Sequence, residues 1–327
     1  MKKIIAIIVC TMFFAGSSNA ELVIDKNLNP EMGDYLKFEV IGNTFGTAIG
    51  KSSFGDNYEG IESFESQVEF MIVGFETIEV DGQKYYCHME KRTMHFNYTI
   101  IVKEDSYNPQ PDDNRVNFSL SLEIKLWKNG SGLIQDTIKS EDITNIAQYW
   151  TEGGEQKSFD QVVEEYIWYT KAQGSPPDTL MVGTSWTLSE DISTNSTIST
   201  RQNGGEWDIE KSGTEESVTT DYEVTAESKV ITSLGTFDTL VIKRTDQGEG
   251  SGNYSIEYLD SKFFTVKSVI FENNAAILTM QLRDYRIKSL ETNSLSDTDS
   301  ASELSNLSFI LSICSIVFLA TIRRAYH

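Results

Sequence analysis

The stretch VEFMIVGFETIEVDGQKYYCHMEKRT, residues 68–93, decides the fold class of this chain. It contains a run rich in β-branched and aromatic residues, a tight Asp81-Gly82 turn and a second run of the same kind. Asp-Gly is a strong hairpin signal, because a type I′ turn requires a positive φ at both central residues. The stretch therefore predicts an antiparallel β-hairpin.

A second phrase, YEVTAESKVITSLGTFDTLVIKRT at residues 222–245, follows the same plan. Both phrases end in Lys-Arg-Thr, and the endings at Thr93 and Thr245 lie 152 positions apart. The segments that begin each half also correspond, with Gly33 and Gly183 offset by 150 positions. The spacing predicts a tandem duplication of a β module, in which each copy buries its own core.

Residues 116–126 give the clearest strand pattern in the chain. Strict alternation of apolar and polar residues indicates a strand with one buried face. The apolar positions are Val116, Phe118, Leu120, Leu122, Ile124 and Leu126.

Residues 151–178 interrupt the β pattern and predict a helical connector. Ser158 with Gln161 reads as a capping box, and the apolar residues that follow have helical spacing. Gly174 and the prolines after it would end the helix.

The two ends of the chain differ in character from the rest. Residues 1–20 have two lysines, a short apolar run and a small-residue cleavage pattern, which predict a secretory signal peptide. Residues 304–322 are uncharged and precede Arg323-Arg324, which predicts a transmembrane helix with a cytoplasmic tail at 323–327. A buried core helix and a processed sorting tail are the alternatives for this segment.

One phrase resembles a known superfamily. VITSLGTFDTLVI at 230–242 is similar to the G-x-F-x-T-x-x-I strand of the Lol-type (LolA-like) lipoprotein carriers and their uncharacterised periplasmic relatives. LWKNGSGLI at 126–134 resembles a further strand-turn-strand phrase of that superfamily. The resemblance implies a curved antiparallel half-barrel with a helix on its concave face and acyl chains held between them. No lipid-binding residue can be carried over, and a tethered chain departs from a carrier that must diffuse.

The resulting fold prediction is mainly β, with two tandem curved, half-barrel-like antiparallel sheets. The first β module covers 21–150 and the second covers 179–288. The connecting helix lies between them, a flexible acidic stalk at 289–303 follows, and the transmembrane helix ends the fold.

Charge and cysteine content limit the function classes. The chain has 49 acidic and 27 basic residues and a net charge of −22, which disfavours binding to nucleic acid and anionic lipid headgroups. Cys10 and Cys314 lie in the terminal apolar segments, so Cys87 alone is left between them and no internal disulfide is expected there.

The residues that could bind a soft metal ion lie close together in the sequence, within residues 87–95. Strand alternation places Cys87 and Met89 on the face opposite His88, which argues against a copper site that includes Met94 and His95. A weak cation site among the aspartates of 104–114 is a second alternative. We expect no metal, no cofactor and no catalytic residue, since no G-x-S-x-G elbow occurs and Cys87 has no activating neighbour.

Three sequons lie in predicted loops and are the candidate glycosylation acceptors: Asn129, Asn195 and Asn253. The functional prediction is a membrane-anchored extracytoplasmic β protein that binds a lipid or another apolar or amphipathic ligand. One alternative is a structural or interaction protein of the cell envelope without a ligand cavity. The other is a hydrolase that uses paired carboxylates.

Overall fold

The computed structural model describes residues 22–23, 30–80, 82–103, 111–131, 134–174, 176–177, 179–247, 252–260 and 264–288. Its elements are β1 (Leu22–Val23), β2 (Tyr35–Val40), α2 (Thr44–Phe54), the 3-10 turn η1 (Gly55–Asn57), β3 (Tyr58–Val80), β4 (Gln83–Val102), β5 (Arg115–Ser131), β6 (Ile134–Glu152), β7 (Glu155–Gln173), β8 (Thr179–Leu180), β9 (Ser185–Gln202), β10 (Asp208–Thr232), β11 (Gly235–Asp246), β12 (Tyr254–Asp260), β13 (Thr265–Glu272) and β14 (Ala275–Arg286).

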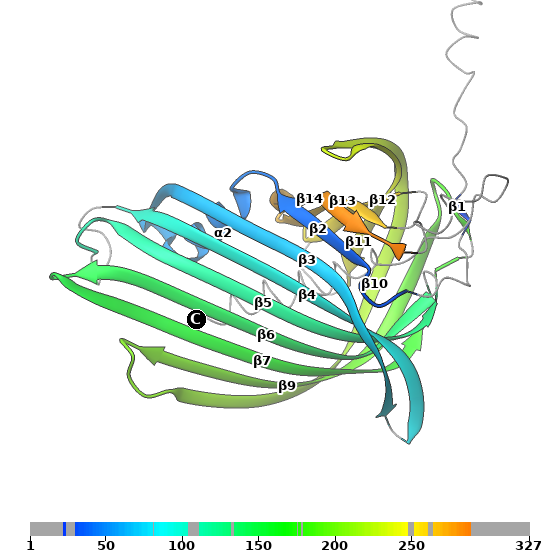
Figure 1. The fold of residues 1–327 in the computed structure, drawn as a ribbon, viewed down its shortest axis with the longest axis horizontal. Coiled ribbons are helices and arrows are strands. Elements are labelled where there is room, and N and C mark those ends of the chain that lie inside the picture. Colours follow the sequence, from blue (N-terminus) through cyan, green and yellow to red (C-terminus); the bar gives the residue numbers. More distant parts are fainter. Residues whose placement is uncertain are drawn as a thin grey trace, which may run out of the picture.

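The strands form one closed antiparallel barrel (Figure 1). Around the barrel the order is β10-β11-β12-β13-β14-β2-β3-β4-β5-β6-β7-β9, and β9 pairs with β10 to close it. β14 pairs with β2, and β7 pairs with β9, so strands from both halves of the chain enclose one interior. The prediction of two tandem half-barrel sheets with separate cores is therefore wrong. Each strand of the barrel has a neighbour on both sides, but β3 pairs with β2 only over residues 68–71, and residues 208–219 of β10 pair with β9 alone.

The repeated phrases occupy equivalent places in this single barrel. Gly33 and Gly183 both have a φ of 91°, which glycine adopts without steric cost. Their N–H groups donate to the carbonyls of Ile72 and Val224, at 2.8 Å in each case. Strands β2–β7 and β9–β14 then follow in the same antiparallel order. Each set supplies six strands of the barrel wall, so neither set is a complete domain.

The prediction of a connector helix at 151–178 is also wrong, because most of this segment forms strand β7. β7 pairs along its length with β6 and β9. Val163, Glu165 and Ile167 face inward at every second position and are buried. The same residues fit a helical and a strand spacing, and pairing with two neighbouring strands decides between them.

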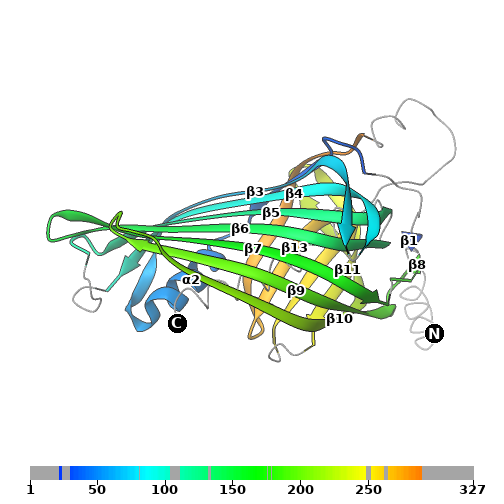
Figure 2. The ribbon, with the colours of Figure 1, turned by 90° about the horizontal axis from the view of Figure 1, so that it is seen from below.

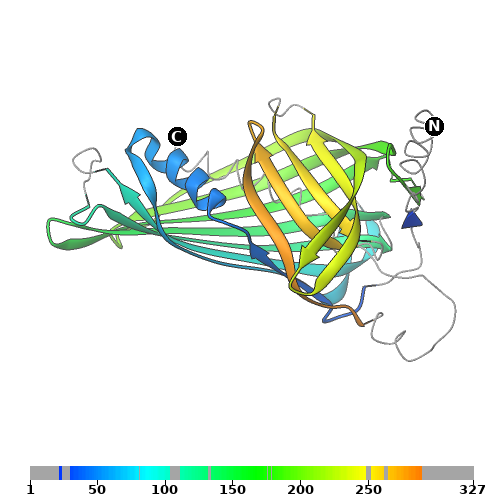
Figure 3. The same ribbon diagram turned by 90° about the horizontal axis from the view of Figure 1, so that it is seen from above.

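The barrel has a long wall and a short wall (Figures 2 and 3). Strands β3–β7, β9 and β10 have 17–25 residues, whereas β2 and β11–β14 have 6–12. α2 packs against β3, β4 and β14, where it covers part of the long wall.

Residues 43–57 are rich in Gly, Ser and Thr, a composition that predicts a loop or hairpin turn, so the sequence pattern does not indicate α2. The ring of Phe45 lies 4.8 Å from that of Phe96, and Ile49 is buried beside them in the same core. A Cβ atom on Gly50 would lie 2.3 Å from the ring of Tyr58. Glycine is therefore required for the close approach of α2 to the following strand.

The inner and outer faces of the long wall differ as the alternation of β5 predicted. The six apolar residues at 116–126 are all buried. The intervening side chains, such as Asn117 and Glu123, are exposed or half-buried on the outer face. This part of the strand prediction is confirmed.

Among the described residues, no helix has the length and apolar character needed to cross a bilayer. The predicted signal peptide, stalk, transmembrane segment and tail lie outside the described residues, so these assignments stay predictions.

Candidate functional site

The inner face of β4 changes from apolar to charged along the strand. Side chains alternate across a strand, so the even-numbered residues from His88 to Val102 share the inward face. From Met94 onward this face is apolar or aromatic and buried. Glu90 and Arg92 lie on the same face, and they are buried too. The fold therefore forces ionised groups into the interior.

Glu90 is the centre of an ionic triad. Its carboxylate Oε1 lies 2.5 Å from Nε of Arg92, and its Oε2 accepts a hydrogen bond from Nζ of Lys128 on β5. The exposed fractions of Glu90, Arg92 and Lys128 are 1, 0 and 0 %. The Arg92 guanidinium also lies 4.8 Å from the centre of the Phe70 ring, in cation–π geometry.

The triad fixes the ionisation state of Glu90. Burial by itself would raise the pKa of this carboxyl, but the charges and hydrogen bonds of Arg92 and Lys128 outweigh burial and lower the pKa to about 2. Glu90 therefore stays ionised at neutral pH and offsets part of the buried positive charge.

A row of inward side chains extends from the triad across the long wall. Arg92, Ile124, Asp142, Glu165 and Ser196 are successive cross-strand partners on β4, β5, β6, β7 and β9. Directly opposed side chains on neighbouring strands lie roughly 5 Å apart. Asp142 and Glu165, which are 4 and 8 % exposed, are therefore adjacent carboxylates inside the barrel. We call Asp142, Glu165 and Ser196 the acidic row.

Asp142 titrates near neutrality. The pKa of its carboxyl is raised to about 7, chiefly by burial and to a smaller extent by the charge of Glu165, while a hydrogen bond from Ser140 Oγ and the charge of Arg92 act in the opposite direction. A carboxyl of this kind exchanges its proton at physiological pH.

The short wall has a second buried ionic centre. Nη2 of Arg244 lies 2.9 Å from Asp246 Oδ1, which also accepts a hydrogen bond from Thr220 at 2.6 Å. The pKa of Tyr222 is raised, first by burial and then by nearby carboxylates that include Glu257, while Arg244 acts to lower it. Arg92 and Arg244 thus hold corresponding places in the two sets of strands.

The acidic row opens toward solvent at β10. Ser212, the β10 partner of Ser196, is exposed, and Thr194 and Ile198 on β9 are half-buried. Within the described part of the chain, Ser196 Oγ and Gln161 Oε1 have no hydrogen-bond partner, although both side chains are at least 94 % buried. Buried polar atoms in native proteins are nearly always paired, so each of these two atoms, which lie in different cross-strand rows, indicates a place for a bound group or water.

Apolar surface adjoins the charged groups. One buried hydrophobic cluster spans β2–β6, β13, β14 and α2. It includes Phe70, Leu122, Ile124 and Leu126, which are the immediate neighbours of Arg92 and Asp142 along the inner wall. The interior therefore joins a buried apolar cluster directly to ionised groups.

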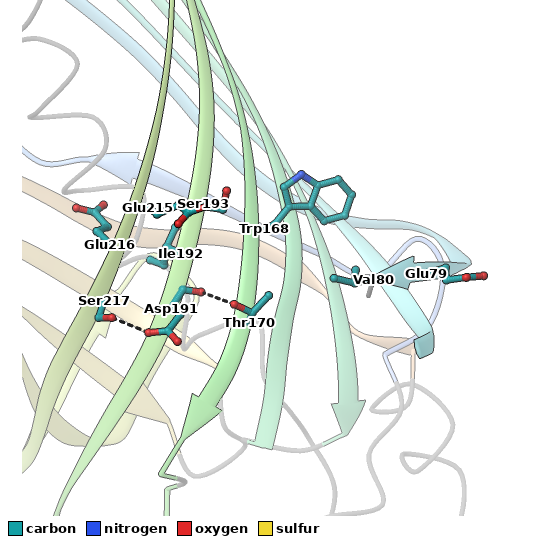
Figure 4. A pocket seen from close by; sticks show the side chains of 10 residues that line it. All are labelled: Glu79, Val80, Trp168, Thr170, Asp191, Ile192, Ser193, Glu215, Glu216 and Ser217. Atoms are coloured by element: carbon teal, nitrogen blue, oxygen red, sulfur yellow. Dashed lines mark hydrogen bonds between the residues drawn. The ribbon is translucent and has the colours of Figure 1, made fainter. Parts of the chain in front are cut away.

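A separate groove of about 780 Å³ lies between β7, β9, β10 and the end of β3 (Figure 4). Asp191 on β9 accepts hydrogen bonds from Ser217 Oγ at 2.6 Å and, through its carbonyl, from Thr170 Oγ1 at 3.4 Å. Glu79 and Glu215 add further carboxylates. The groove is lined mainly by polar side chains, and the hydrogen bonds of Asp191 join β9 to β7 and β10.

The residues of 87–95 do not converge. Cys87 is buried against Trp127 and Ile138, and Met89 packs at the edge of that cluster. His88 lies on the opposite face, and His95 is exposed. Burial, with a smaller contribution from Glu76, raises the pKa of the Cys87 thiol to about 11. Among the described residues no group of three histidine, cysteine or acidic side chains is placed to hold a metal.

The aspartates of the predicted cation loop have structural partners where they are described. Asp112 accepts hydrogen bonds from the N–H groups of Gly153 and Gly154 at 2.8 and 2.7 Å. Asp113 lies 4.0 Å from the Arg115 guanidinium. The aspartate at 105 lies outside the described residues. Asp112 therefore fixes the turn between β6 and β7.

Of the sequon residues, Asn253 precedes β12 as expected, and its Oδ1 accepts a hydrogen bond from Asn273 N at 3.1 Å. The loop prediction is wrong for Asn195, which is exposed in the middle of β9, and for Asn129, which lies within β5. Their use as glycosylation acceptors stays a prediction.

Sequence reasoning missed the buried charges. The repeated Lys-Arg-Thr ending was noted as a marker of duplication, but its arginine was not assigned to the interior. The available signal was the period-two pattern of 88–102, which puts Glu90 and Arg92 on the face of Phe96 and Ile100. Asp142 and Glu165 gave no such signal, because the inward-facing residues of their strands include both polar and apolar side chains.

No family model, curated protein or solved structure matches this chain. The resemblance to the Lol-type carriers therefore has no support beyond the quoted phrases, and the half-barrel that it implied is replaced by a closed barrel.

Proposed function

We propose that this protein binds an amphipathic ligand inside its barrel. The observation that carries the proposal is the joining of an apolar inner surface to fully buried ionised groups in one interior that opens at β9 and β10. Ligand sites in proteins are mostly apolar cavities with a few placed polar groups, and this interior has that composition.

The strand number supports the proposal. An eight-stranded barrel has an interior that side chains just fill, and the diameter grows roughly linearly with the number of strands. Twelve strands therefore enclose more space than an eight-stranded barrel. Inward residues near β10, such as Ser196 and Thr194, are small, so they take up less of that space than larger side chains would.

The energetic cost of the buried charges also supports the proposal of a ligand site. Each buried ion costs several kcal/mol of desolvation, and an apolar replacement of similar volume is often as stable. Holding Glu90, Arg92, Lys128, Asp142 and Glu165 in one interior is thus poorly explained by stability alone. Recognition of a polar group on a ligand gives them a role.

The proposed location is the extracytoplasmic side of a membrane, with the chain held by residues 304–322. This rests on the sequence of the two ends. Resistance of the full chain to extraction by alkaline carbonate, together with loss of residues 1–20 from the mature protein, would support the location. Release of the intact chain into the soluble fraction would contradict it.

Ligand uptake tests the function. The purified protein is stripped of lipid, mixed with amphiphiles of one chain length and measured by native mass spectrometry. We expect a defined one-to-one adduct. The variant Ile198→Trp should fill the opening and abolish the adduct, whereas Thr197→Trp, on the outer face of the same strand, should retain it. Absence of any adduct with the unmodified protein would favour a structural or interaction protein of the envelope.

A carboxylate hydrolase is the second candidate, and the adjacent pair Asp142 and Glu165 favours it. One carboxyl near pKa 7 beside a second is the arrangement that general acid–base catalysis requires. Hydrolysis of aryl glycosides by the unmodified protein, lost in Asp142→Asn, would support this candidate. No turnover above the Asp142→Asn variant would remove it.

A further inference from the structure

We propose that the acidic row binds the cationic head, a primary ammonium group, of the amphipathic ligand. This inference rests on the proposed function and specifies its ligand class. Asp142, Glu165 and Ser196 lie side by side on three neighbouring strands and project into the same interior.

The order of the charged side chains, from the opening inward, favours a ligand with a positively charged head. A molecule that enters from the exposed inner face of β10 reaches Ser196 and Glu165 first, Asp142 next and Arg92 last. Arg92 is fully buried and is held by Glu90 at 2.5 Å. A carboxylate or phosphate head would therefore meet two carboxylates before it met a cation, and like charges at this separation repel strongly in a buried setting.

A buried polar atom gives independent support. Ser196 Oγ, on a side chain that is 5 % exposed, is without a hydrogen-bond partner among the described residues. Ser196 is the cross-strand partner of Glu165, so its hydroxyl lies beside the carboxylates of the row. An ammonium group carries three N–H donors and no acceptor, which matches a site made of carboxylate and hydroxyl oxygens.

Small side chains leave room beside the carboxylates. Ser196 faces Glu165 on one side and Ser212 on the other, and Thr194 and Thr214 flank them along the same two strands. The neighbouring inner residues Val163 and Ile198 are apolar and suit the first carbons of an alkyl chain. The head therefore rests on the acidic row while the chain follows the apolar surface toward β6 and β5.

Three probes with the same chain test this inference: dodecylamine, dodecanoate and dodecanol, each below its aggregation threshold at pH 7.4. We expect dodecylamine to bind at least about tenfold more tightly than either of the others, since a charge-assisted hydrogen bond contributes that much to affinity. Glu165→Gln should remove most of this preference, and Ser196→Ala should weaken dodecylamine binding roughly threefold. The control Glu164→Gln alters the outward neighbour on β7 and should leave the preference intact.

A second readout uses the unmodified protein and does not depend on the folding of a variant. The groups that act on Asp142 are Ser140 on its own strand, Glu165 on β7 and Arg92 on β4, and Arg92 in turn is paired with Glu90. A cation that binds beside it should favour the ionised carboxylate. Calorimetry of dodecylamine binding in two buffers of different ionisation enthalpy should therefore show proton release at pH 7, and dodecanol should show none.

The outcomes separate the two proposals. If none of the three probes binds, the proposed function fails and this inference fails with it. If dodecanoate or dodecanol binds as tightly as dodecylamine, the barrel is a ligand-binding protein but the acidic row does not select a cation. A preference for the amine that persists in a folded Glu165→Gln protein would place the cation site elsewhere.

Discussion

Replacing Glu90 by glutamine is the sharpest test of the buried triad. The substitution keeps the shape of the side chain but removes the carboxylate that bonds both Arg92 and Lys128, which are 0 % exposed. Removing one partner of a buried ion pair costs about 3–5 kcal/mol, because the remaining charge stays buried. We expect the free energy of unfolding of Glu90→Gln to fall by that amount.

The assay is equilibrium unfolding in urea, followed by circular dichroism and by tryptophan fluorescence. With a slope of about 3 kcal/mol per molar urea, a loss of about 3–5 kcal/mol moves the midpoint down by roughly 1–1.7 M. Coincident transitions by the two probes would support a two-state analysis.

The matched control is Glu123→Gln on the outer face of β5. Glu123 also has two lysine partners, Lys91 at 2.7 Å and Lys125 at 3.7 Å, but its side chain is 34 % exposed. Partly exposed ion pairs contribute roughly 0–1 kcal/mol, so the control should change little. If the two variants lost similar stability, the claim that the triad is a desolvated ionic centre would be refuted.

The sign of the pH dependence follows from the same groups. The pKa of Glu90 is lowered in the folded protein, so its contribution is present above the unfolded-state pKa and is lost as the pH falls toward 2. The pKa of Asp142 is raised to about 7, so the folded state binds more protons than the unfolded state between about pH 4 and 7. Stability from Asp142 therefore declines as the pH rises from about 4 and has been lost once the pH passes about 7.

Three further predictions concern single positions. Asp142→Asn should flatten the decline in stability between pH 5 and 8, as measured by urea midpoints at each pH, and an unchanged slope would contradict the assignment. Gly50→Ala should destabilise the protein by about 1–3 kcal/mol, because the new Cβ meets the Tyr58 ring at 2.3 Å; Gly60→Ala, with nothing within 4 Å among the described residues, should change the thermal midpoint little. With the other two cysteines replaced by serine, Cys87 should resist thiol reagents at pH 8 until the protein unfolds, and rapid labelling of the native state would show that its cluster is open.

The local sequence pattern was sufficient to predict some secondary-structure elements but not others. The alternation at 116–126 reports side-chain direction residue by residue, and β5 has the buried face that it predicted. In β7 the inward residues Val163, Glu165 and Ile167 include a charge, so the strand lacks clean alternation and fitted a helix equally well. The two glycines of α2 suggested a loop, because their role is a contact with Tyr58 and Tyr98 that the local sequence does not display.

The candidate site likewise contains residues whose direction the local sequence predicts and residues whose position depends on the tertiary structure. Glu90 and Arg92 were readable as inward residues once β4 was treated as a strand, since they continue the buried series that begins at Val102. That Asp142 and Glu165 stand beside them depends on which strands are neighbours and in what register. A shift of one residue in either pairing would have put these carboxylates in water.

The amino-acid sequence by itself determined the β class, the repeated hairpin and the alternation of individual strands, because these depend on residues that are near one another in the chain. Only the tertiary structure decided that the two sets of strands close into one barrel. The pair β14–β2, between the last and the first strand of the barrel along the chain, places Arg286 opposite Tyr35, and the register of that pair depends on the twist and curvature accumulated over every strand between them. The burial of the charged row is a consequence of that closure.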